Sequence, residues 1–212
     1  MDANQEIEIE FKNLLVKEEY ERLLQTFNLN EDSPVKQINH YLDTEDFQLK
    51  SHGCALRIRE KKGTFTLTLK QPKDNALLET HQEITIDEMN SIMDGNSIPQ
   101  GSISVILTNK LSVGDNLIKY FGSLTTYRFE TKYESGLLVL DKSEYLDVTD
   151  YELEFEVCNY EIGQAEFVQL LDIEKIQMRE TKNKIVRFYE RKKLLMEGWI
   201  QIENRPTPYN DR

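Results

Sequence analysis

The segment from residue 6 to residue 12 places a charge at every second position, and this alternation constrains the fold more than any other feature of the chain. Its charged positions and its apolar positions are Glu6, Glu8, Glu10, Lys12 and Ile7, Ile9, Phe11. A period of two is that of a β-strand, in which successive side chains point to opposite faces. One face of this strand is therefore entirely charged, and the fold has to accommodate it.

Further segments repeat the alternation, and each carries its own sign of charge. The polar positions are Arg57 and Arg59, then Thr66, Thr68 and Lys70, then Glu152, Glu154 and Glu156. Like charges that neighbour one another on a sheet are destabilising unless other groups compensate them. Cations that face carboxylates supply this compensation, so we expect the basic strands to lie opposite the acidic ones.

A closed sheet meets this requirement. If the strands form a barrel with the charged faces inward, the glutamate strands face the arginine and lysine strands across a water-filled lumen, and helices cover the apolar outer faces. The charged faces could instead be the solvated exterior of an ordinary β-sandwich. That alternative does not explain why one set of strands carries glutamate and another carries arginine or lysine.

The remaining pattern indicates short strands with a few helices between them. We predict strands at residues 6–12, 35–43, 55–61, 64–71, 78–87, 124–134, 136–145 and 150–158, and helices at residues 17–28, 115–121, 162–171 and 182–196. Repeated short strands favour an antiparallel α+β fold over alternating βα units. We expect a single barrel domain over residues 1–196 and a C-terminal extension over residues 197–212.

The charge balance limits the partners of the chain. With a formal net charge of −12, the surface lacks the excess of Lys and Arg that duplex nucleic acid requires. No stretch approaches the roughly 18 apolar residues of a membrane span, and the segment Met1–Lys12 is too acidic for a signal peptide. We expect a cytoplasmic protein that binds neither duplex nucleic acid nor a membrane, and the oligomeric state stays open.

The inward charges fit a small polyanion and a metal ion. A triphosphate carries about four negative charges near neutral pH, so it needs several cations and usually a divalent metal. The cations that could bind it are Lys12, Arg57, Arg59, Lys70, Arg128 and one of Lys182 and Lys184. Carboxylate oxygens suit Mg²⁺ or Mn²⁺, and the candidate metal ligands are Glu8, Glu10, Glu152 and Glu154. The sequence contains neither GxxxxGK nor GxGxxG, so side chains would hold the phosphates.

An ordered series of motifs resembles the CYTH family, the triphosphate tunnel metalloenzymes, and looks closest to its small bacterial, YjbK-like branch. The series is ExExK at Glu8–Lys12, YxDT at Tyr41–Thr44, ALRIR at Ala55–Arg59, the strand Thr66–Lys70, the strand Asp150–Glu156, and Thr181-Lys182 in place of a Ser-Lys pair. The resemblance implies a closed eight-stranded antiparallel β-barrel, dependence on Mg²⁺ or Mn²⁺, and a substrate that bears a triphosphate.

The resemblance also implies roles for single residues. Lys12, Glu83 and Asp141 stand at catalytic positions, and Arg128 stands at the position of a later arginine. Two departures reduce the number of cations. Glu79 and His81 stand near an Arg-x-Glu pair of many relatives, and Thr126 stands where many have lysine. Fewer cations would weaken binding of a long polyphosphate or shift which phosphate is cleaved, so we expect Glu79 and His81 only to line the lumen.

The leading hypothesis is a metal-dependent triphosphatase that hydrolyses inorganic triphosphate or a related small triphosphate. Such a reaction needs no covalent nucleophile, because a carboxylate or the metal can position the attacking water. The alternatives are an adenylyl cyclase of the same fold, a thiamine triphosphatase, and a non-catalytic sensor of polyphosphate or nucleotide. A pure anion binder gains little from a site lined with glutamate, which favours an enzyme.

Overall fold

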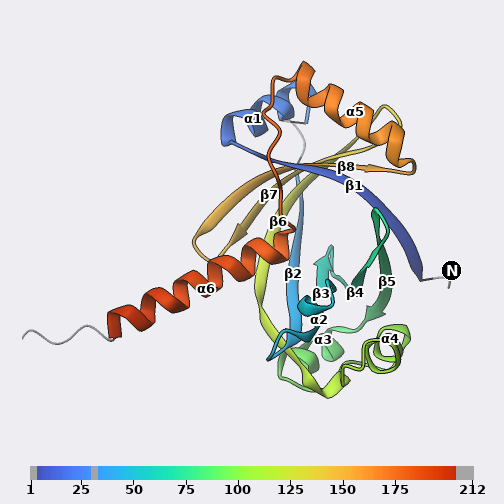
Figure 1. The fold of residues 1–212 in the computed structure, drawn as a ribbon, viewed down its shortest axis with the longest axis vertical. Helices are drawn as coiled ribbons and strands as arrows, with labels where there is room; N and C mark the ends of the chain where they lie inside the picture. The colour runs from blue at the N-terminus through green and yellow to red at the C-terminus, as the bar shows by residue number, and fades with distance from the viewer. Residues whose placement is uncertain (1–3, 30–32, 204–212) are drawn as a thin grey trace, which may run out of the picture. The chain divides into compact units, whose positions relative to one another are not determined.

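The strands close into a single barrel. The computed structural model describes residues 4–29 and 33–203, with their side chains as far as residue 197. In this part of the chain, eight antiparallel strands follow one another around the barrel in the order β1-β5-β4-β3-β2-β6-β7-β8 (Figure 1). Their bounds are β1 Gln5–Leu15, β2 Val35–Thr44, β3 Ala55–Lys61, β4 Thr64–Lys73, β5 Ala76–Ile84, β6 Ile118–Tyr133, β7 Gly136–Tyr145 and β8 Val148–Val157. The predicted α+β barrel is confirmed.

The interior of the barrel is charged. Ion pairs between strands that are not neighbours show that the charged side chains point inward. Lys70 of β4 contacts Glu8 of β1, and Arg128 of β6 contacts Glu154 of β8. The strands β5 and β7 separate these pairs in the barrel, so the four side chains lie on the inner face. The register agrees, since Lys12 lies directly opposite Glu154 and such partners share a face. A sandwich with these charges on its exterior is excluded.

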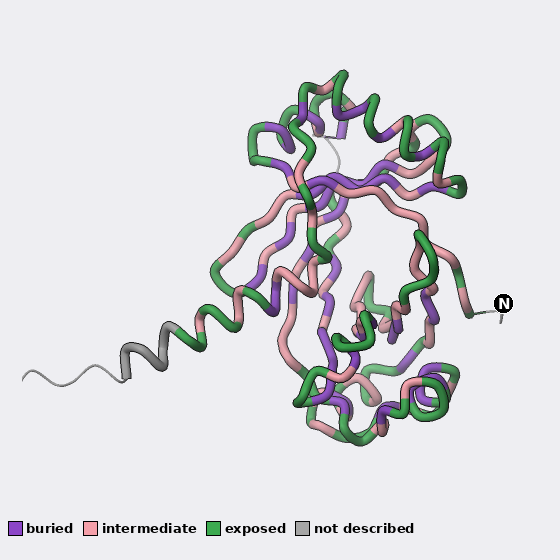
Figure 2. The backbone as a smooth tube through the Cα atoms, in the orientation of Figure 1, coloured by how far each residue is buried: buried purple, intermediate pink, exposed green. Residues whose placement is uncertain are grey.

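Helices cover the apolar outer faces in two layers (Figures 1 and 2). Helices α1, Lys17–Thr26, and α5, Tyr160–Ile173, pack on β1 and β8. On the opposite side, α2, Gln48–Ser51, packs on β2 and β3, α3, Ile86–Met93, on β6, and α4, Ser102–Lys110, on β5.

Two separate apolar clusters result. One includes Leu42, Leu49, Leu56, Ile58, Leu67, Leu69, Ile92 and Leu107, and the other includes Leu15, Leu23, Leu138, Leu140, Leu153, Phe155 and Phe167. Each fully buried side chain of this size stabilises the fold by about 1.5–3 kcal/mol. Apolar layers outside the barrel therefore hold it together, and the interior is left for polar chemistry.

Several predicted boundaries are wrong, and two of them have a clear physical cause. The strand predicted at residues 78–87 ends at Ile84, because Thr85 caps α3. Thr85 Oγ1 accepts a hydrogen bond from the Glu88 amide at 3.2 Å, and the Glu88 carboxylate accepts one from the Thr85 amide at 2.7 Å. The helix predicted at residues 115–121 is only the 3-10 turn η1, Asp115–Leu117, and Ile118 already begins β6. Backbone pairing with β2 decides the second case, since Ile118 lies opposite Thr44.

The described residues divide into two compact units, the first up to residue 181 and the second from residue 182 onward. Within the second unit, α6 runs from Lys184 to Glu203 and continues past the predicted end at residue 196. The predicted limit between residues 196 and 197 stays a prediction, and residues 204–212 of the predicted extension lie outside the described residues. Among the helices described here, none combines the length and the apolar character that membrane crossing requires.

Candidate active site

One corner of the lumen centres on Lys70. Its ammonium group lies 2.6 Å from Glu8 Oε2 and also contacts Glu79, and Arg57 Nη2 lies 3.9 Å from Glu79 Oε2. Burial by itself would raise the pKa of Glu79, but Arg57 and Lys70 outweigh burial and hold that pKa at about 2. Burial also raises the pKa of Glu8, against the attraction of Lys70. This corner joins two predicted phosphate ligands to one predicted metal ligand.

The adjoining wall is rich in guanidinium groups. Arg59 Nε donates a hydrogen bond to Asn39 Oδ1 of β2 at 2.9 Å. Burial, together with the nearby Arg57 and Arg128, lowers the pKa of Arg59 to about 9. The buried Nε of Arg57 has no hydrogen-bond partner among the described residues. Mutually repelling guanidinium groups and a buried N–H donor without a partner among the described residues are typical of a site that binds an anion.

A buried ion-pair network occupies the wall formed by β6, β7 and β8. Arg128 grips Asp141 with two hydrogen bonds, from Nε to Oδ1 at 2.8 Å and from Nη2 to Oδ2 at 2.7 Å. The same Nη2 donates to Glu154 Oε2 at 2.6 Å, and Nη1 lies 3.6 Å from Glu156 Oε1. Burial opposes the charge of Arg128, but Asp141 and Glu154 raise its pKa well above the ordinary value. The guanidinium group of Arg128 thus forms ion pairs with three carboxylates.

Carboxylates gather where β1 meets β8. Glu10 lies opposite Glu156, and Lys12, which contacts Glu10, lies opposite Glu154. Burial opposes the charge of Lys12, but Glu10 and Glu154 outweigh burial and raise its pKa. Burial raises the pKa of Glu156 to about 7, helped by Glu154 and Glu10 and opposed by Arg128. Burial is the main cause of this rise and the neighbouring carboxylates add to it, and a divalent cation bound here would favour the ionised form.

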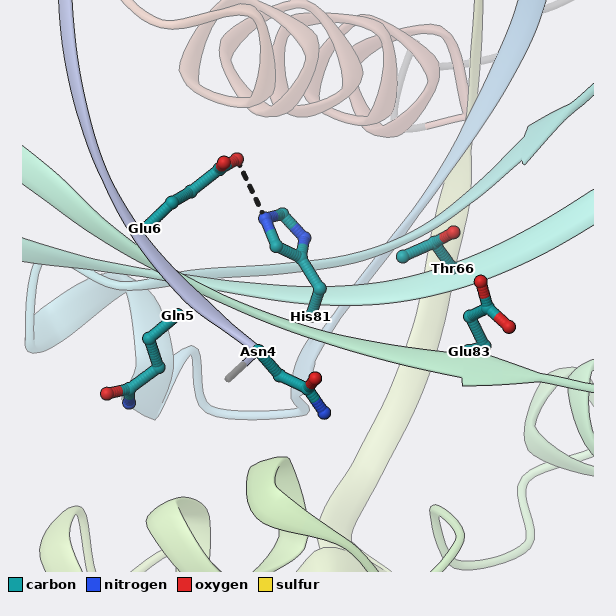
Figure 3. Close-up of a pocket in the computed structure, with 6 residues that line it drawn as sticks. All are labelled: Asn4, Gln5, Glu6, Thr66, His81 and Glu83. Carbon is teal, nitrogen blue, oxygen red and sulfur yellow. Dashed lines mark hydrogen bonds and ion pairs between the residues drawn. The ribbon is translucent and has the colours of Figure 1, made fainter. Parts of the chain in front are cut away.

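A pocket of about 460 Å³ lies at the N-terminal end of β1 (Figure 3). His81 Nε2 lies 3.0 Å from Glu6 Oε1 and 3.5 Å from Glu79 Oε2, and its Nδ1 lies 3.1 Å from Thr68 Oγ1. The ligand atoms of Glu6, Glu79 and His81 all lie within 4.8 Å of one another, close enough to hold a cation. Lys70 already contacts Glu79, so a cation here would compete with this lysine.

The predicted catalytic residue Glu83 also lines this pocket, beside Thr66 (Figure 3). Glu83 is exposed, so water reaches it freely. The other predicted catalytic residues differ from it, since Lys12 is half-buried and Asp141 is 0% exposed. Asp141 therefore contacts its protein neighbours instead of solvent. The catalytic roles of the three residues stay predictions.

Most of the predicted ligands come together in the lumen. Three predicted metal ligands each contact a predicted phosphate ligand, in the pairs Glu8–Lys70, Glu10–Lys12 and Glu154–Arg128. The fourth, Glu152, is 1% exposed and lies opposite Asp141. Lys182 and Lys184 belong to the second unit, where Lys182 pairs with Glu190 at 2.6 Å. What each of these residues binds stays a prediction.

Three lumen residues were not among the predicted ligands. Glu156 continues the glutamate alternation of β8, so its position was visible in the sequence although its proximity to Glu10 was not. Glu79 was expected only to line the lumen, yet it holds both Lys70 and Arg57. Asn39 gives no signal of its own, because a single amide in a strand is common. Strand register is the information that all three required.

Comparison with known proteins gives a consistent result. Residues 6–189 match the CYTH domain. The chain is 48% identical over 190 residues to "Putative triphosphatase YjbK" of Bacillus subtilis (strain 168), which covers 90% of this chain and 98% of that protein. A Bacillus halodurans crystal structure, described as a "putative adenylate cyclase", has a TM-score of 0.84 and 42% identity over 88% of this chain and 100% of that one.

A more distant solved structure has the same fold. HpAC1 from Hippeastrum, described as a "putative adenylyl cyclase" with a dominant triphosphatase activity, has a TM-score of 0.72 at 22% identity, over 87% of this chain and 95% of that one. The barrel, its charged lumen and the match over residues 6–189 all agree. The chain belongs to the CYTH domain family.

Proposed function

We propose that this chain is a metal-dependent triphosphatase that hydrolyses inorganic triphosphate or a related small triphosphate inside the barrel. One observation carries the proposal. Arg57 and Arg59 crowd one wall of the lumen, the pKa of Arg59 falls to about 9, and the buried Arg57 Nε lacks a hydrogen-bond partner among the described residues. A bound polyanion would relieve the repulsion and accept that hydrogen bond.

The cations of the lumen would share the phosphates. Arg57 and Arg59 would bind phosphate oxygens through planar, directional contacts, whereas Lys12 and Lys70 would act as point charges. Arg128, with Lys182 or Lys184, completes the proposed set. Lys12 and Lys70 already contact carboxylates, so phosphate binding would redistribute existing ion pairs.

The carboxylates would hold the metal. Glu8, Glu10, Glu152 and Glu154 are the proposed ligands, and the near-neutral pKa of Glu156 supports including it in the set. Oxygen donors of this kind suit Mg²⁺ or Mn²⁺. A bound divalent cation supplies charge neutralisation and Lewis acidity toward the phosphates. The identity of the B. subtilis relative, at 48%, supports a triphosphatase.

The residues of this chain would perform the rest of the reaction. The guanidinium wall would hold the triphosphate and stabilise negative charge as the phosphoryl group transfers. The exposed Glu83, in the pocket at the N-terminal end of β1, would orient the attacking water and accept its proton. No covalent nucleophile is required.

A second candidate is an adenylyl cyclase, favoured by the description of the 42% identical B. halodurans structure. Cyclisation would need a pocket for the nucleoside and a base for the attacking ribose oxygen. The charged contacts of the lumen favour phosphate over a nucleobase, so we rank hydrolysis first.

Product analysis separates the candidates. The protein would be given inorganic triphosphate, ATP and thiamine triphosphate, with Mg²⁺ and then with Mn²⁺, and the products identified by chromatography. We expect pyrophosphate and phosphate from inorganic triphosphate. Cyclic AMP with pyrophosphate from ATP would overturn the proposal.

A pair of matched variants tests the metal assignment. Glu154→Gln should abolish metal-dependent turnover with the barrel intact, because it removes a ligand charge from the lumen. Glu144→Gln makes the same chemical change at a β7 position that is 42% exposed and pairs with Lys142, and it should leave turnover unchanged. Full activity in Glu154→Gln would exclude Glu154 as a metal ligand.

A further inference from the structure

Asp141 is the most enclosed charged residue of the network on β6, β7 and β8, and its position does not suit a residue that touches substrate. It is 0% exposed. In the register it lies between Arg128 of β6 and Glu152 of β8, so one row of charge crosses three strands. Both of its carboxylate oxygens accept hydrogen bonds from Arg128, at 2.8 and 2.7 Å.

Arg128 passes the constraint on to β8. The planar guanidinium group has its orientation fixed by the two bonds to Asp141. In that orientation Nη2 reaches Glu154 Oε2 at 2.6 Å and Nη1 lies 3.6 Å from Glu156 Oε1. β7 lies between β6 and β8 in the barrel, so the Arg128 side chain extends across β7 to reach β8. The contacts of Arg128 thus set the orientation of the Glu154 and Glu156 side chains.

The pairing also controls how much positive charge the β8 carboxylates receive. Arg128 donates hydrogen bonds from Nε and Nη2 to Asp141, so the negative charge of Asp141 partly neutralises the positive charge that Arg128 presents to Glu154 and Glu156. Without Asp141 the full guanidinium charge would bind these carboxylates and compete with any metal. Both effects, alignment and charge control, act on the carboxylates at the junction of β1 and β8.

We propose that Asp141 and Arg128 form a positioning pair that orients Glu154 and Glu156 toward the metal, with Asp141 acting through Arg128. The inference rests on the proposed metal-dependent function of the same tunnel. Asp141 is then a positioning residue. Partners of metal ligands commonly change metal affinity by about 10–100-fold when they are removed.

The first test measures Mn²⁺ affinity of the full chain from the electron paramagnetic resonance signal of free Mn²⁺. Asp141→Asn should bind Mn²⁺ at least about 10-fold more weakly than the wild type. Calorimetry with inorganic triphosphate in EDTA should show no loss of affinity for the metal-free variant. Arg57→Ala should show the reverse, a loss of triphosphate affinity with no loss of Mn²⁺ affinity. Wild-type Mn²⁺ affinity in Asp141→Asn would overturn the proposal.

A double variant separates alignment from charge. Asp141→Asn combined with Arg128→Gln removes one negative and one positive charge, so the net charge of the lumen stays that of the wild type. If the pair aligns the glutamates, Mn²⁺ binding stays at least about 10-fold weaker in the double variant. Recovery of wild-type affinity would show that only charge balance matters and would overturn the alignment.

Folding and function are controlled separately. Near-ultraviolet circular dichroism reports whether each variant retains its packed aromatic residues. If Asp141→Asn does not fold, Arg128→Lys replaces it, since lysine keeps the charge and cannot form two parallel hydrogen bonds to Asp141. We expect about 10-fold weaker Mn²⁺ binding, and wild-type binding would overturn the proposal. These titrations need no turnover, so failure of the wild type to hydrolyse any triphosphate would count against the proposed function alone.

Discussion

At the scale of single residues, the neighbours of each lumen carboxylate determine whether it carries charge. Glu79 lies against Lys70 and Arg57, and its pKa is held at about 2. Glu156 lies among other carboxylates, and burial raises its pKa to about 7. The two side chains face the same lumen. The lumen is therefore polarised, with surplus positive charge near β3 and β4 and surplus negative charge where β1 meets β8.

Glu156→Gln should make the metal-free protein more stable at high pH. The pKa of Glu156 is above its ordinary 4.5, so the folded state favours the protonated form. This contribution to stability is fully present below pH 4.5 and is lost as the pH rises through about 7. At about pH 8 the wild type carries a buried negative charge that neighbouring carboxylates repel, and glutamine removes this charge. We expect a gain of about 1 kcal/mol, because a side chain that is 33% exposed is partly screened.

Urea unfolding at about pH 5 and about pH 8, without metal, measures this difference. The gain should shrink toward zero at the lower pH, where Glu156 is protonated. Glu144→Gln is the matched control on the outer face. An equal gain at both pH values would contradict the assigned cause.

Arg57→Ala should weaken triphosphate binding by about tenfold, since it removes a buried donor and one of the crowded cations. The loss should be largest at low salt, because screening already weakens the wild-type contact at high salt. Calorimetry of the metal-free protein over a range of salt concentrations measures both effects. Lys36→Ala, at an exposed position of β2, removes the same charge elsewhere and should change little. Equal losses in both variants would indicate that only net charge matters.

Single-residue periodicity predicts which side chains share the lumen, and it cannot predict their partners. Alternation alone places Glu8, Glu10, Arg57 and Lys70 on inward faces. The contact of Glu79 with Lys70 depends on the register of β4 against β5, which pairs these two residues. The reach of Arg128 to Glu154 depends on strand order, because β7 lies between their strands. Register and order arise from the whole barrel, so they are absent from any local pattern.

At the scale of elements, a motif first noted for its resemblance has a structural role. Asp43 is the last residue but one of β2 and is 2% exposed. Its carboxylate accepts hydrogen bonds from the backbone amides of Thr44 at 2.8 Å, Leu49 at 2.9 Å and Lys50 at 3.1 Å. Thr44 Oγ1 accepts a further one from the Gln48 amide at 2.8 Å. The Asp-Thr pair thus caps the short helix α2 and fixes the turn from β2 toward β3.

Asp43→Ala should destabilise the protein by about 2–3 kcal/mol, because three backbone amides lose a buried charged acceptor. Urea unfolding measures the change. Asp46→Ala is the matched control, since the exposed Asp46 carboxylate accepts hydrogen bonds from the side chains of Thr44 and Gln48, and we expect little change. Wild-type stability in Asp43→Ala would show that the amides find other partners.

Long-range pairing explains which elements the sequence predicts well. The strands predicted at residues 55–61 and 136–145 coincide with β3 and β7, because tight turns and clear alternation define them locally. The start of β6 was mistaken for helix, since it forms only by pairing with the end of β2. The register between these strands shifts at Tyr41/Leu42, opposite Gly122 with φ of 143°. A bulge of this kind leaves no local periodicity to detect.

At the scale of the whole molecule, the first unit contains the eight described strands of the barrel and the apolar clusters that pack on them. All pairings between strands and both apolar clusters lie within the described residues up to residue 181. The segment that ends this unit contacts α1 and β1. Arg179 lies 2.8 Å from Glu19 of α1, and Thr181 accepts a hydrogen bond from the Leu14 amide of β1 at 2.8 Å. The strand pairings and the two apolar clusters of the barrel therefore all lie within one unit.

A chain shortened to residues 1–181 should still fold. We expect the circular dichroism of a β-rich protein and one cooperative thermal transition. Triphosphate affinity should fall if Lys182 or Lys184 binds phosphate, and Lys182→Ala with Lys184→Ala in the full chain should show the same loss. A shortened chain without a cooperative transition would contradict the independence of the first unit.

The closure of the barrel has a consequence for how the chain reaches its native state. The pairing of β1 with β8 joins Lys12 to Glu154, across most of the length of the chain. Among the strands that the structure describes, β1 emerges first during synthesis and its partner β8 emerges last. Until then both edges of an unfinished sheet remain exposed, together with the charges that will face each other inside. Contacts so distant in sequence make folding slow, so we expect the barrel to form in one late step after synthesis of β8 rather than strand by strand.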